Sequence, residues 1–311
     1  MLKAGALIQM ESKVAISVDV EDWYHSRHVL STDNAPNSAV KAFKQKFNRN
    51  FTFLNAPIQK LLELYDRFNV RATFFLVADL IDDYQNTFES IVDAGHEIGC
   101  HGLHHIEYIG EGSAAELQLF RENVSMSKRM LEELCGSPVI GFRAPSAFYR
   151  PWMTVVLKQL GFTYDSSISR NSLFNKFGRK IPNHIQTSPV YLENSGNNQS
   201  DIVEIPWPYL NIAGFKIPTG GGPTIRYFPP FINKWGVRQS LRKGDTSLYI
   251  HPHDISLDPL PDIIADSRRK FWRNRGEEAH SRYRSIIESF EGRTATCGEI
   301  YERFLRANQG V

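Results

Sequence analysis

A run of β-branched and apolar residues, Val14–Val20 (VAISVDV), is the feature that most constrains how this chain can fold. Apolar side chains fall on both faces of the run, which is typical of a strand buried on both sides in a parallel sheet. The carboxyl end of the run carries three acids, Asp19, Glu21 and Asp22. The run therefore predicts a buried parallel strand that ends in a cluster of carboxylates.

Strand and helix patterns alternate at short spacing after this run. Strands are predicted at 70–77, 96–101, 139–143, 163–167 and 247–251, and helices at 57–69, 87–93, 114–134, 152–160 and 268–290. Alternation of this kind predicts right-handed strand–helix–strand units. Repeated units favour an α/β fold of the distorted (β/α) barrel type, in which the active site lies where the carboxyl ends of the strands meet. Residues 171–222, rich in Asn, Pro, Gly and Ser, predict an elaborated face of loops and a hairpin.

Length and charge narrow the class of protein. A chain of 311 residues fits one large domain, with a motif-bearing core at about 14–254 and a C-terminal helical segment at 255–311. Because 36 basic and 34 acidic residues leave a net charge of +2, no nucleic-acid partner is expected. The three cysteines lack CxxC spacing, which argues against a disulfide framework and a cysteine zinc site. No stretch reaches the roughly 20 apolar residues of a membrane span, and no signal peptide is recognised, so we expect a cytoplasmic protein.

The acidic cluster is the densest chemical feature. Asp19, Glu21 and Asp22 would repel one another when packed together, unless a positive charge neutralises them or one of them holds a proton. A bound metal would supply that charge. An isolated acidic pair more often begins a solvated loop or caps a helix, but Asp19 resists this interpretation because it interrupts the buried strand itself.

A histidine pair follows another predicted strand. His101 and His105 stand four residues apart and could converge on one ion if the segment turned into a helix, while His104 is a spare candidate. Imidazole nitrogens with one carboxylate suit Zn²⁺ or a similar divalent metal. An HxxxH pair alone is a weak signal, and two ordinary surface histidines would give the same letters.

Two further polar residues come at predicted strand ends. Arg143, in the run FRAPS, could hold Asp19 ionised and oriented through a bidentate pair. His251, in the run YIHPHD, could donate a proton to a leaving amine. A surface arginine and a capping histidine are equally common explanations of either residue alone. The interpretation gains weight because all four features are expected on one face of the fold.

In this order, the motifs SVDVED, HGLHH, FRAPS, YDSS and YIHPH resemble those of the polysaccharide deacetylase family, carbohydrate esterase family 4, also called the NodB homology domain. The form DVEDWYH, with FRAPS and HPHD, is similar to a branch often linked to exopolysaccharide or O-antigen biosynthesis. The resemblance implies a metal-dependent N-deacetylase that hydrolyses the acetamido group of an N-acetylated sugar in a polysaccharide or its precursor.

The resemblance also implies roles. Asp19 resembles the catalytic base, His101 and His105 the metal-binding histidines, Arg143 the arginine that orients the base, and His251 the general acid. The metal would be Zn²⁺, with Co²⁺, Ni²⁺ or Mn²⁺ as alternatives.

Three assignments are looser. Asp165 resembles in position the aspartate that tunes the general acid, although the surrounding motif departs from the usual one. Val20 stands where the family usually has a second aspartate, so either Glu21 or Asp22 could be the metal carboxylate, and the sequence leaves the choice open. The backbone N–H near Ser146 would help to hold the oxyanion.

Specificity is expected from the loops. Trp23, Tyr24 and Trp207 offer flat apolar faces suited to sugar rings, although core packing is the more common fate of an aromatic residue. The glycines at 220–222 could let the backbone approach a substrate, and Arg226 could supply a charged contact.

Two other functions are compatible with these motifs. One is a hydrolase of cyclic amides of the allantoin type, since family members that open ring amides often have an altered first motif. The other is a catalytically silent carbohydrate-binding protein, which is less favoured because the base, the histidines and the arginine are all present.

Overall fold

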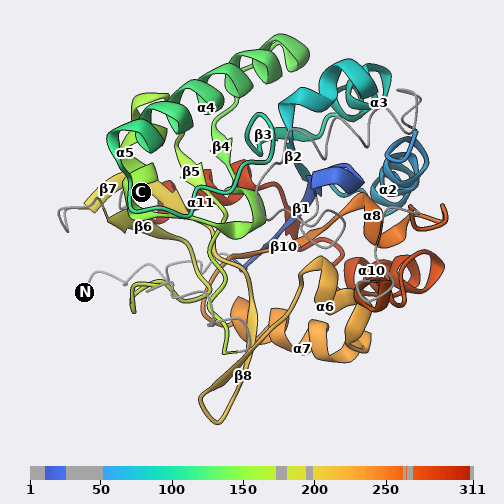
Figure 1. Cartoon of the computed structure of the whole chain (residues 1–311). Helices are drawn as coiled ribbons and strands as arrows, with labels where there is room; N and C mark the ends of the chain where they lie inside the picture. The colour runs from blue at the N-terminus through green and yellow to red at the C-terminus, as the bar shows by residue number, and fades with distance from the viewer. Residues whose placement is uncertain are drawn as a thin grey trace, which may run out of the picture.

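The computed structural model describes residues 11–25, 52–172, 181–193, 199–261, 264 and 269–308. Within these residues one nine-stranded sheet has the order β10–β1–β2–β3–β4–β5–β7–β6, with β11 also beside β1 (Figure 1). Its neighbouring strands are parallel except for the pair β6–β7. The strands are β1 Val14–Val20, β2 Thr73–Leu76, β3 Glu97–Cys100, β4 Gly141–Phe142, β5 Tyr164–Asp165, β6 Val190–Glu193, β7 Gln199–Glu204, β10 Thr246–Ile250 and β11 Thr294–Ala295.

Helices follow most of the parallel strands and cover the sheet (Figure 1). They are α2 Asn55–Arg67, α3 Ile81–Asp93, α4 Ala114–Cys135, α5 Pro151–Gln159, α6 Gly222–Tyr227, α7 Pro230–Leu241, α8 Pro252–Ile255, α10 Glu277–Glu288 and α11 Cys297–Asn308. Because strands and helices alternate through α5, the predicted strand–helix–strand units are confirmed. None of the described helices has the length and apolar character to cross a membrane.

Strand β1 lies inside the sheet, as its apolar sequence predicts. All seven of its residues are buried. One edge pairs with β10 from Val14 to Val18. β2 pairs with the part of β1 from Ser17 to Val20. β11 pairs with the first two residues of β1, Val14 and Ala15. The strand is therefore fixed along its whole length, and its carboxyl end is held in a defined place.

The predicted helix at 268–290 is wrong. Its described part contains a single 3₁₀ turn, Lys270–Trp272, and then a separate helix, α10. Asn274 and Gly276, between them, have φ angles of 57° and 74°. A right-handed helix cannot pass through left-handed backbone, so the charged pattern is divided in two.

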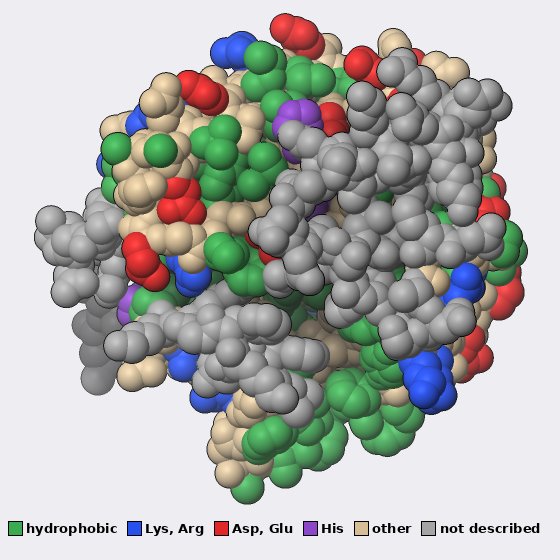
Figure 2. Space-filling view, viewed as in Figure 1, with side chains coloured by type: hydrophobic (Ala, Val, Ile, Leu, Met, Phe, Trp, Pro, Cys, Tyr) green, Lys and Arg blue, Asp and Glu red, His purple; other side chains and the backbone are tan. Residues whose placement is uncertain are grey.

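The segment at 171–222 contains antiparallel pairs, as expected for a loop face with a hairpin. Besides β6–β7, strands β8 (Tyr209–Ile212) and β9 (Phe215–Pro218) form a two-stranded hairpin. Residues 173–180 and 194–198 of this segment lie outside the described residues. The hairpin projects from the lower end of the molecule in Figure 1, and Figure 2 shows hydrophobic side chains gathered there.

A single large cluster of buried apolar residues joins the early and late parts of the chain, from Val14 to Phe290. The carboxyl ends of β1, β3, β4 and β10 come together at one edge of the sheet, since these strands run parallel in one layer. The polar motifs of the sequence lie at that edge.

Candidate metal centre and active site

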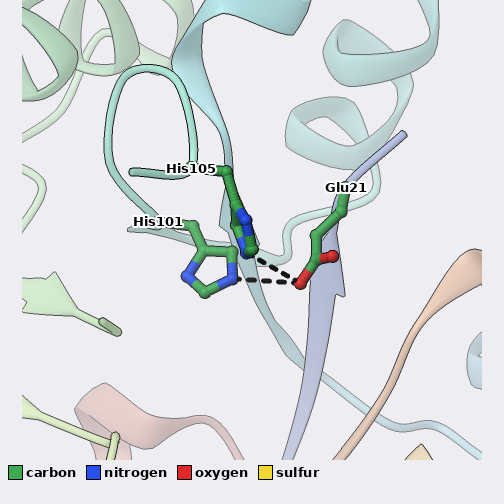
Figure 3. Close-up of side chains that lie close together, drawn as sticks. All are labelled: Glu21, His101 and His105. Carbon is green, nitrogen blue, oxygen red and sulfur yellow. Dashed lines mark hydrogen bonds and ion pairs between the residues drawn. The ribbon is translucent and has the colours of Figure 1, made fainter. Parts of the chain in front are cut away.

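Glu21, His101 and His105 converge at the carboxyl edge of the sheet (Figure 3). Oε1 of Glu21 lies 3.4 Å from Nε2 of His101 and 3.1 Å from Nε2 of His105. Neighbouring nitrogen and oxygen ligands of a tetrahedral Zn²⁺ ion, at their usual bond lengths, lie about 3.3 Å apart. All three side chains are buried. The spacing of the three atoms therefore fits one divalent ion.

The orientation of His101 supports this fit. Its Nδ1 lies 2.8 Å from the carbonyl oxygen of Arg143, so Nδ1 carries the proton and donates it. Nε2 faces the carboxylate of Glu21, where it can donate a hydrogen bond or, when unprotonated, bind a metal ion. A carbonyl that accepts from the other ring nitrogen is usual for a metal-binding histidine.

His105 reaches the cluster from a loop. The HxxxH spacing was expected to bring the two histidines together through a helix, but the segment after β3 is not helical. His105 has a φ of 54°. Among the described residues its Nε2 has no partner in hydrogen-bond geometry, although it is buried. The left-handed backbone and the unpartnered nitrogen both fit a side chain held for a metal. His104 faces away from the cluster, with Nδ1 2.9 Å from Asp79.

The structure places Glu21, and not Asp22, beside the histidines. The carboxylate of Asp22 accepts hydrogen bonds from the hydroxyl of Tyr84 at 2.6 Å and from the backbone N–H of Trp23 at 2.5 Å. Side chains alternate between the faces of a strand, so residue 21 shares the face of Asp19 while residue 22 lies opposite. That alternation is the sequence signal that could have separated the two acids.

Electrostatics couples Glu21 to its neighbours. Burial alone would raise the pKa of Glu21, but the charge of His105 and hydrogen bonds from the surrounding histidines hold it well below its ordinary value. Burial would likewise lower the pKa of His105, whereas Glu21 raises it. Without a metal, the histidines carry the positive charge that the buried carboxylate needs.

Arg143 and Asp19 form a buried ion pair, as predicted, but through one nitrogen–oxygen contact and not the expected bidentate pair, because the other guanidinium nitrogens donate to Ser166. Nη1 of Arg143 lies 2.5 Å from Oδ1 of Asp19 and 2.8 Å from Oγ of Ser17. The opposite side of the guanidinium donates to the carbonyl and hydroxyl of Ser166, and its plane lies 4.1 Å from the ring centre of Phe75. Arg143 is thereby fixed, and it holds Asp19 in one orientation.

His251 lies on the other side of Glu21, 3.5 Å from Nε2 to Oε1. Its Nδ1 lies 3.2 Å from Oδ2 of Asp254, whose Oδ1 is 2.6 Å from Nε of Arg226. Burial would lower the pKa of His251, but Asp254 and Glu21 raise it well above its ordinary value. Burial opposes the ionisation of Asp254, yet Arg226 and His251 lower its pKa to about 2.

Asp254 is a site residue that the sequence analysis missed. It is the third residue of the short helix α8, and its carboxylate accepts from the backbone N–H of His251 at 3.0 Å. An acid three residues after the first capping position is a known helix-start signature, so the spacing in YIHPHD could have indicated it.

Two expected roles differ in the structure. Arg226 is not placed for an exposed substrate contact: it is buried, it pairs with Asp254, and its guanidinium lies 4.8 Å from the ring centre of Trp272. Gly222 brings the backbone close to the histidine rather than to an open surface, because a Cβ there would lie 2.1 Å from Asp254 and 2.8 Å from His251.

Asp165 lies away from His251 and pairs with another acid. It is directly opposite Glu204 on the neighbouring strand and accepts from the hydroxyl of Ser167 at 2.7 Å. Burial raises the pKa of Asp165, and burial with the nearby Asp165 charge raises the pKa of Glu204 well above its ordinary value. The carboxylate that contacts the general-acid candidate is Asp254.

The candidate aromatic platforms are buried. Trp23 packs 4.3 Å from His253 and 4.9 Å from Trp272, measured between ring centres, and Tyr24 is also buried. Trp207 lies 4.3 Å from the ring of Tyr249. In the described structure these rings therefore pack in the interior beside the site and are not exposed platforms for a sugar ring.

The expected part of Ser146 in holding the oxyanion stays a prediction, and the structure gives its place in the chain. It is exposed, at the turn that follows β4, and both Ser146 and Ala147 have positive φ angles, 51° and 58°. Two consecutive non-glycine residues in left-handed backbone are uncommon, and such strain is concentrated at functional sites.

Two family models and a curated protein match parts of this chain. Residues 51–164 match a family model described as polysaccharide deacetylase, and residues 180–296 match one described as a domain of unknown function. The chain is 28% identical over 274 residues to a peptidoglycan deacetylase of Helicobacter pylori, covering 81% of this chain and 84% of that protein.

Solved structures show the same fold at low identity. A probable polysaccharide deacetylase from Pseudomonas aeruginosa has a TM-score of 0.59 at 16% identity, covering 94% of this chain and 90% of that one. The Puue allantoinase has a TM-score of 0.57 at 16% identity, covering 94% and 91%. These likenesses confirm the distorted (β/α) barrel.

The buried acid pair gives a pH dependence of stability. Because the pKa of Glu204 is higher in the folded chain, folding is favoured at low pH and loses stability as the pH rises towards the folded-state pKa. We expect Glu204→Gln to raise the thermal unfolding midpoint by a few degrees at about pH 8 and to have little effect at about pH 5. The exposed change Glu122→Gln is the matched control. An equal shift at both pH values would contradict this account.

Proposed function

With the polysaccharide deacetylase family as the best supported place for this chain, we propose that it is a metal-dependent N-deacetylase of an N-acetylated sugar. The observation that carries the proposal is the meeting of Glu21, His101 and His105. The same edge of the sheet carries a carboxylate oriented by Arg143, Asp19, and an imidazole that lies beside Glu21, His251. Metal-dependent hydrolysis of an amide uses a metal ion to polarise the carbonyl, a base to activate water and an acid to protonate the leaving nitrogen.

Glu21, His101 and His105 would hold the metal, with Zn²⁺ favoured by the two imidazoles and one carboxylate. A divalent ion there would supply Lewis-acid polarisation of the acetyl carbonyl and would acidify a water molecule. The fourth position would stay open to the substrate, as in catalytic zinc sites generally.

Asp19 would remove a proton from the attacking water. Arg143 keeps it turned in one direction through the hydrogen bond from Nη1 to Oδ1. The ion pair with Arg143 uses Oδ1 of Asp19. We propose that Oδ2, the other oxygen, accepts the proton from the water.

His251 would give a proton to the departing nitrogen. Its Nδ1 is engaged by Asp254, so Nε2 is the atom directed at the site. Arg226 and Asp254 act as positioning residues behind it. The backbone N–H at Ser146 would add a donor for the oxyanion, a contribution of the order of 3 kcal/mol per donor in related chemistry.

The substrate proposal is narrower than the family. We propose a precursor-sized acetamido sugar in polysaccharide biosynthesis of the exopolysaccharide or O-antigen kind, handled in the cytoplasm. The link to this kind of polysaccharide rests on the form of the first motif, DVEDWYH, whereas the cytoplasmic location carries over the expectation from the sequence analysis; both stay predictions.

The direct test is acetate release. We expect purified protein supplied with Zn²⁺ or Co²⁺ to release acetate from a panel of acetamido sugars, and Asp19→Asn to lower the rate by at least ~100-fold because the base is lost. Asn keeps an acceptor for Arg143, and near-ultraviolet circular dichroism checks the fold. Wild-type and Asp19→Asn protein that are equally inactive on the whole panel would contradict the proposal. Ring opening of cyclic amides, or glycan binding without turnover, would favour one of the two alternative functions.

The metal assignment has its own test. Metal analysis after dialysis should find about one equivalent of Zn²⁺ in the wild type, much less in Glu21→Gln, and the wild-type amount in Asp22→Asn, because only Glu21 faces both histidines. Acetate release should follow the same order. Loss of metal from Asp22→Asn with retention in Glu21→Gln would overturn the assignment.

A further inference from the structure

Residues 205–244 contain no aspartate or glutamate, although the whole chain has 34 acidic residues. The segment holds five basic side chains besides the buried Arg226: Lys216, Lys234, Arg238, Arg242 and Lys243. It forms the hairpin β8–β9, helix α6 and helix α7. Charge of one sign is therefore concentrated on neighbouring elements in a chain that is almost neutral.

Helix α7 presents apolar and basic side chains on one exposed face. Phe231 and Trp235 are 64% and 50% exposed, and Arg238 and Arg242 continue the same row towards the end of the helix. Intervals of three and four residues place these four side chains on one side of a helix. The opposite face is buried against the protein through Val237 and Leu241 among others.

The tip of the hairpin, which lies beside α7, carries two exposed apolar side chains. Ile212 and Phe215 are 46% and 49% exposed. The hairpin is fastened to α7, because the side chain of Gln239 accepts from the backbone N–H of Asn211 at 2.6 Å and donates to its carbonyl at 3.2 Å. Figure 2 shows hydrophobic side chains at the lower end, where Figure 1 places the hairpin and α7.

Basic side chains link the two elements. Lys216 of the hairpin and Lys243 after α7 lie 5.8 Å and 5.6 Å from the same ring centre, that of Tyr209. Among the described residues, none of the five basic side chains pairs with a carboxylate within 4.0 Å. The face therefore offers cations that no described carboxylate pairs with.

We propose that this face, formed by the exposed side chains of α7 and the β8–β9 hairpin, docks on the surface of an anionic lipid bilayer. Exposed Trp and Phe favour the boundary between lipid tails and headgroups, and neighbouring Lys and Arg attract anionic headgroups. An acidic protein would satisfy the cations but leaves the projecting apolar tip unexplained. A second copy of the chain would bring like charges together. The bilayer satisfies both features, and the proposal uses none of the active-site residues.

Vesicle sedimentation tests the proposal with the full chain. We expect the protein to sediment with phosphatidylcholine vesicles that contain phosphatidylglycerol, and at least about tenfold less with phosphatidylcholine alone, because the electrostatic contribution is needed beside the apolar one. Added salt should weaken the binding. Absence of binding to the anionic vesicles at low ionic strength would overturn the proposal.

Paired variants locate the surface. Phe231→Ala with Trp235→Ala, and separately Arg238→Gln with Arg242→Gln, should each reduce binding by about tenfold or more, since both contributions are required. The controls lie on α4, at the other end of the molecule in Figure 1: Leu119→Ala with Met126→Ala, and Arg121→Gln with Arg129→Gln. Equal loss in the control pairs, or wild-type binding by the α7 pairs, would contradict the location.

Tryptophan fluorescence gives a readout that a general loss of stability would not imitate. Trp235 is 50% exposed, whereas Trp23, Trp152, Trp207 and Trp272 are at most 9% exposed. Brominated lipids in the anionic vesicles should therefore quench Trp235, and Trp235→Phe should remove the quenching while the protein still sediments. Quenching that persists in Trp235→Phe would rule out this face. If Phe231→Ala with Trp235→Ala instead converted an oligomer to monomer without any vesicle binding by the wild type, the face would be a contact between copies.

Discussion

Three buried carboxylates at the carboxyl edge of the sheet, Asp19, Asp254 and Glu21, lie beside basic side chains. Asp19 has Arg143, Asp254 has Arg226, and Glu21 has, among the described residues, the imidazoles of His101, His105 and His251. An unpaired charge in such a place costs several kcal/mol, of the order of 3–5 when one partner is removed. Two of these acids have an arginine as partner, and the third faces His101 and His105, with which we propose that it binds a metal.

This division of charge separates the roles in the site. The two arginines orient the groups that would move protons: Arg143 holds Asp19, and Arg226 holds Asp254 behind His251. Glu21, which faces histidines, is the carboxylate that we propose binds the metal ion. The polysaccharide deacetylase relatives and the (β/α) barrel agree with a hydrolase of this kind. The same segment that supplies Arg226 continues into α7, so the proposed membrane-facing surface begins next to a positioning residue of the site.

The sequence predicted what depends on local pattern. The β-branched run gave β1 correctly, and the positions of Asp19, Arg143 and His251 at strand ends anticipated their meeting. The sequence-based predictions failed where the outcome depends on the direction in which a side chain points or on the backbone conformation. Glu21 and Asp22 differ only in the face they occupy, and the break before α10 depends on left-handed backbone at Gly276. Arg226 and the aromatic residues are buried by segments distant in sequence, which composition does not reveal.

The most direct test of the account is anomalous X-ray scattering at the zinc edge, from crystals grown with Zn²⁺. The account predicts one strong peak within about 2.0–2.2 Å of Nε2 of His101, Nε2 of His105 and a carboxylate oxygen of Glu21. Asp22 would remain bound to the hydroxyl of Tyr84. A peak ligated by Asp22, or crystals with Zn²⁺ in which these three side chains bind no ion, would contradict it.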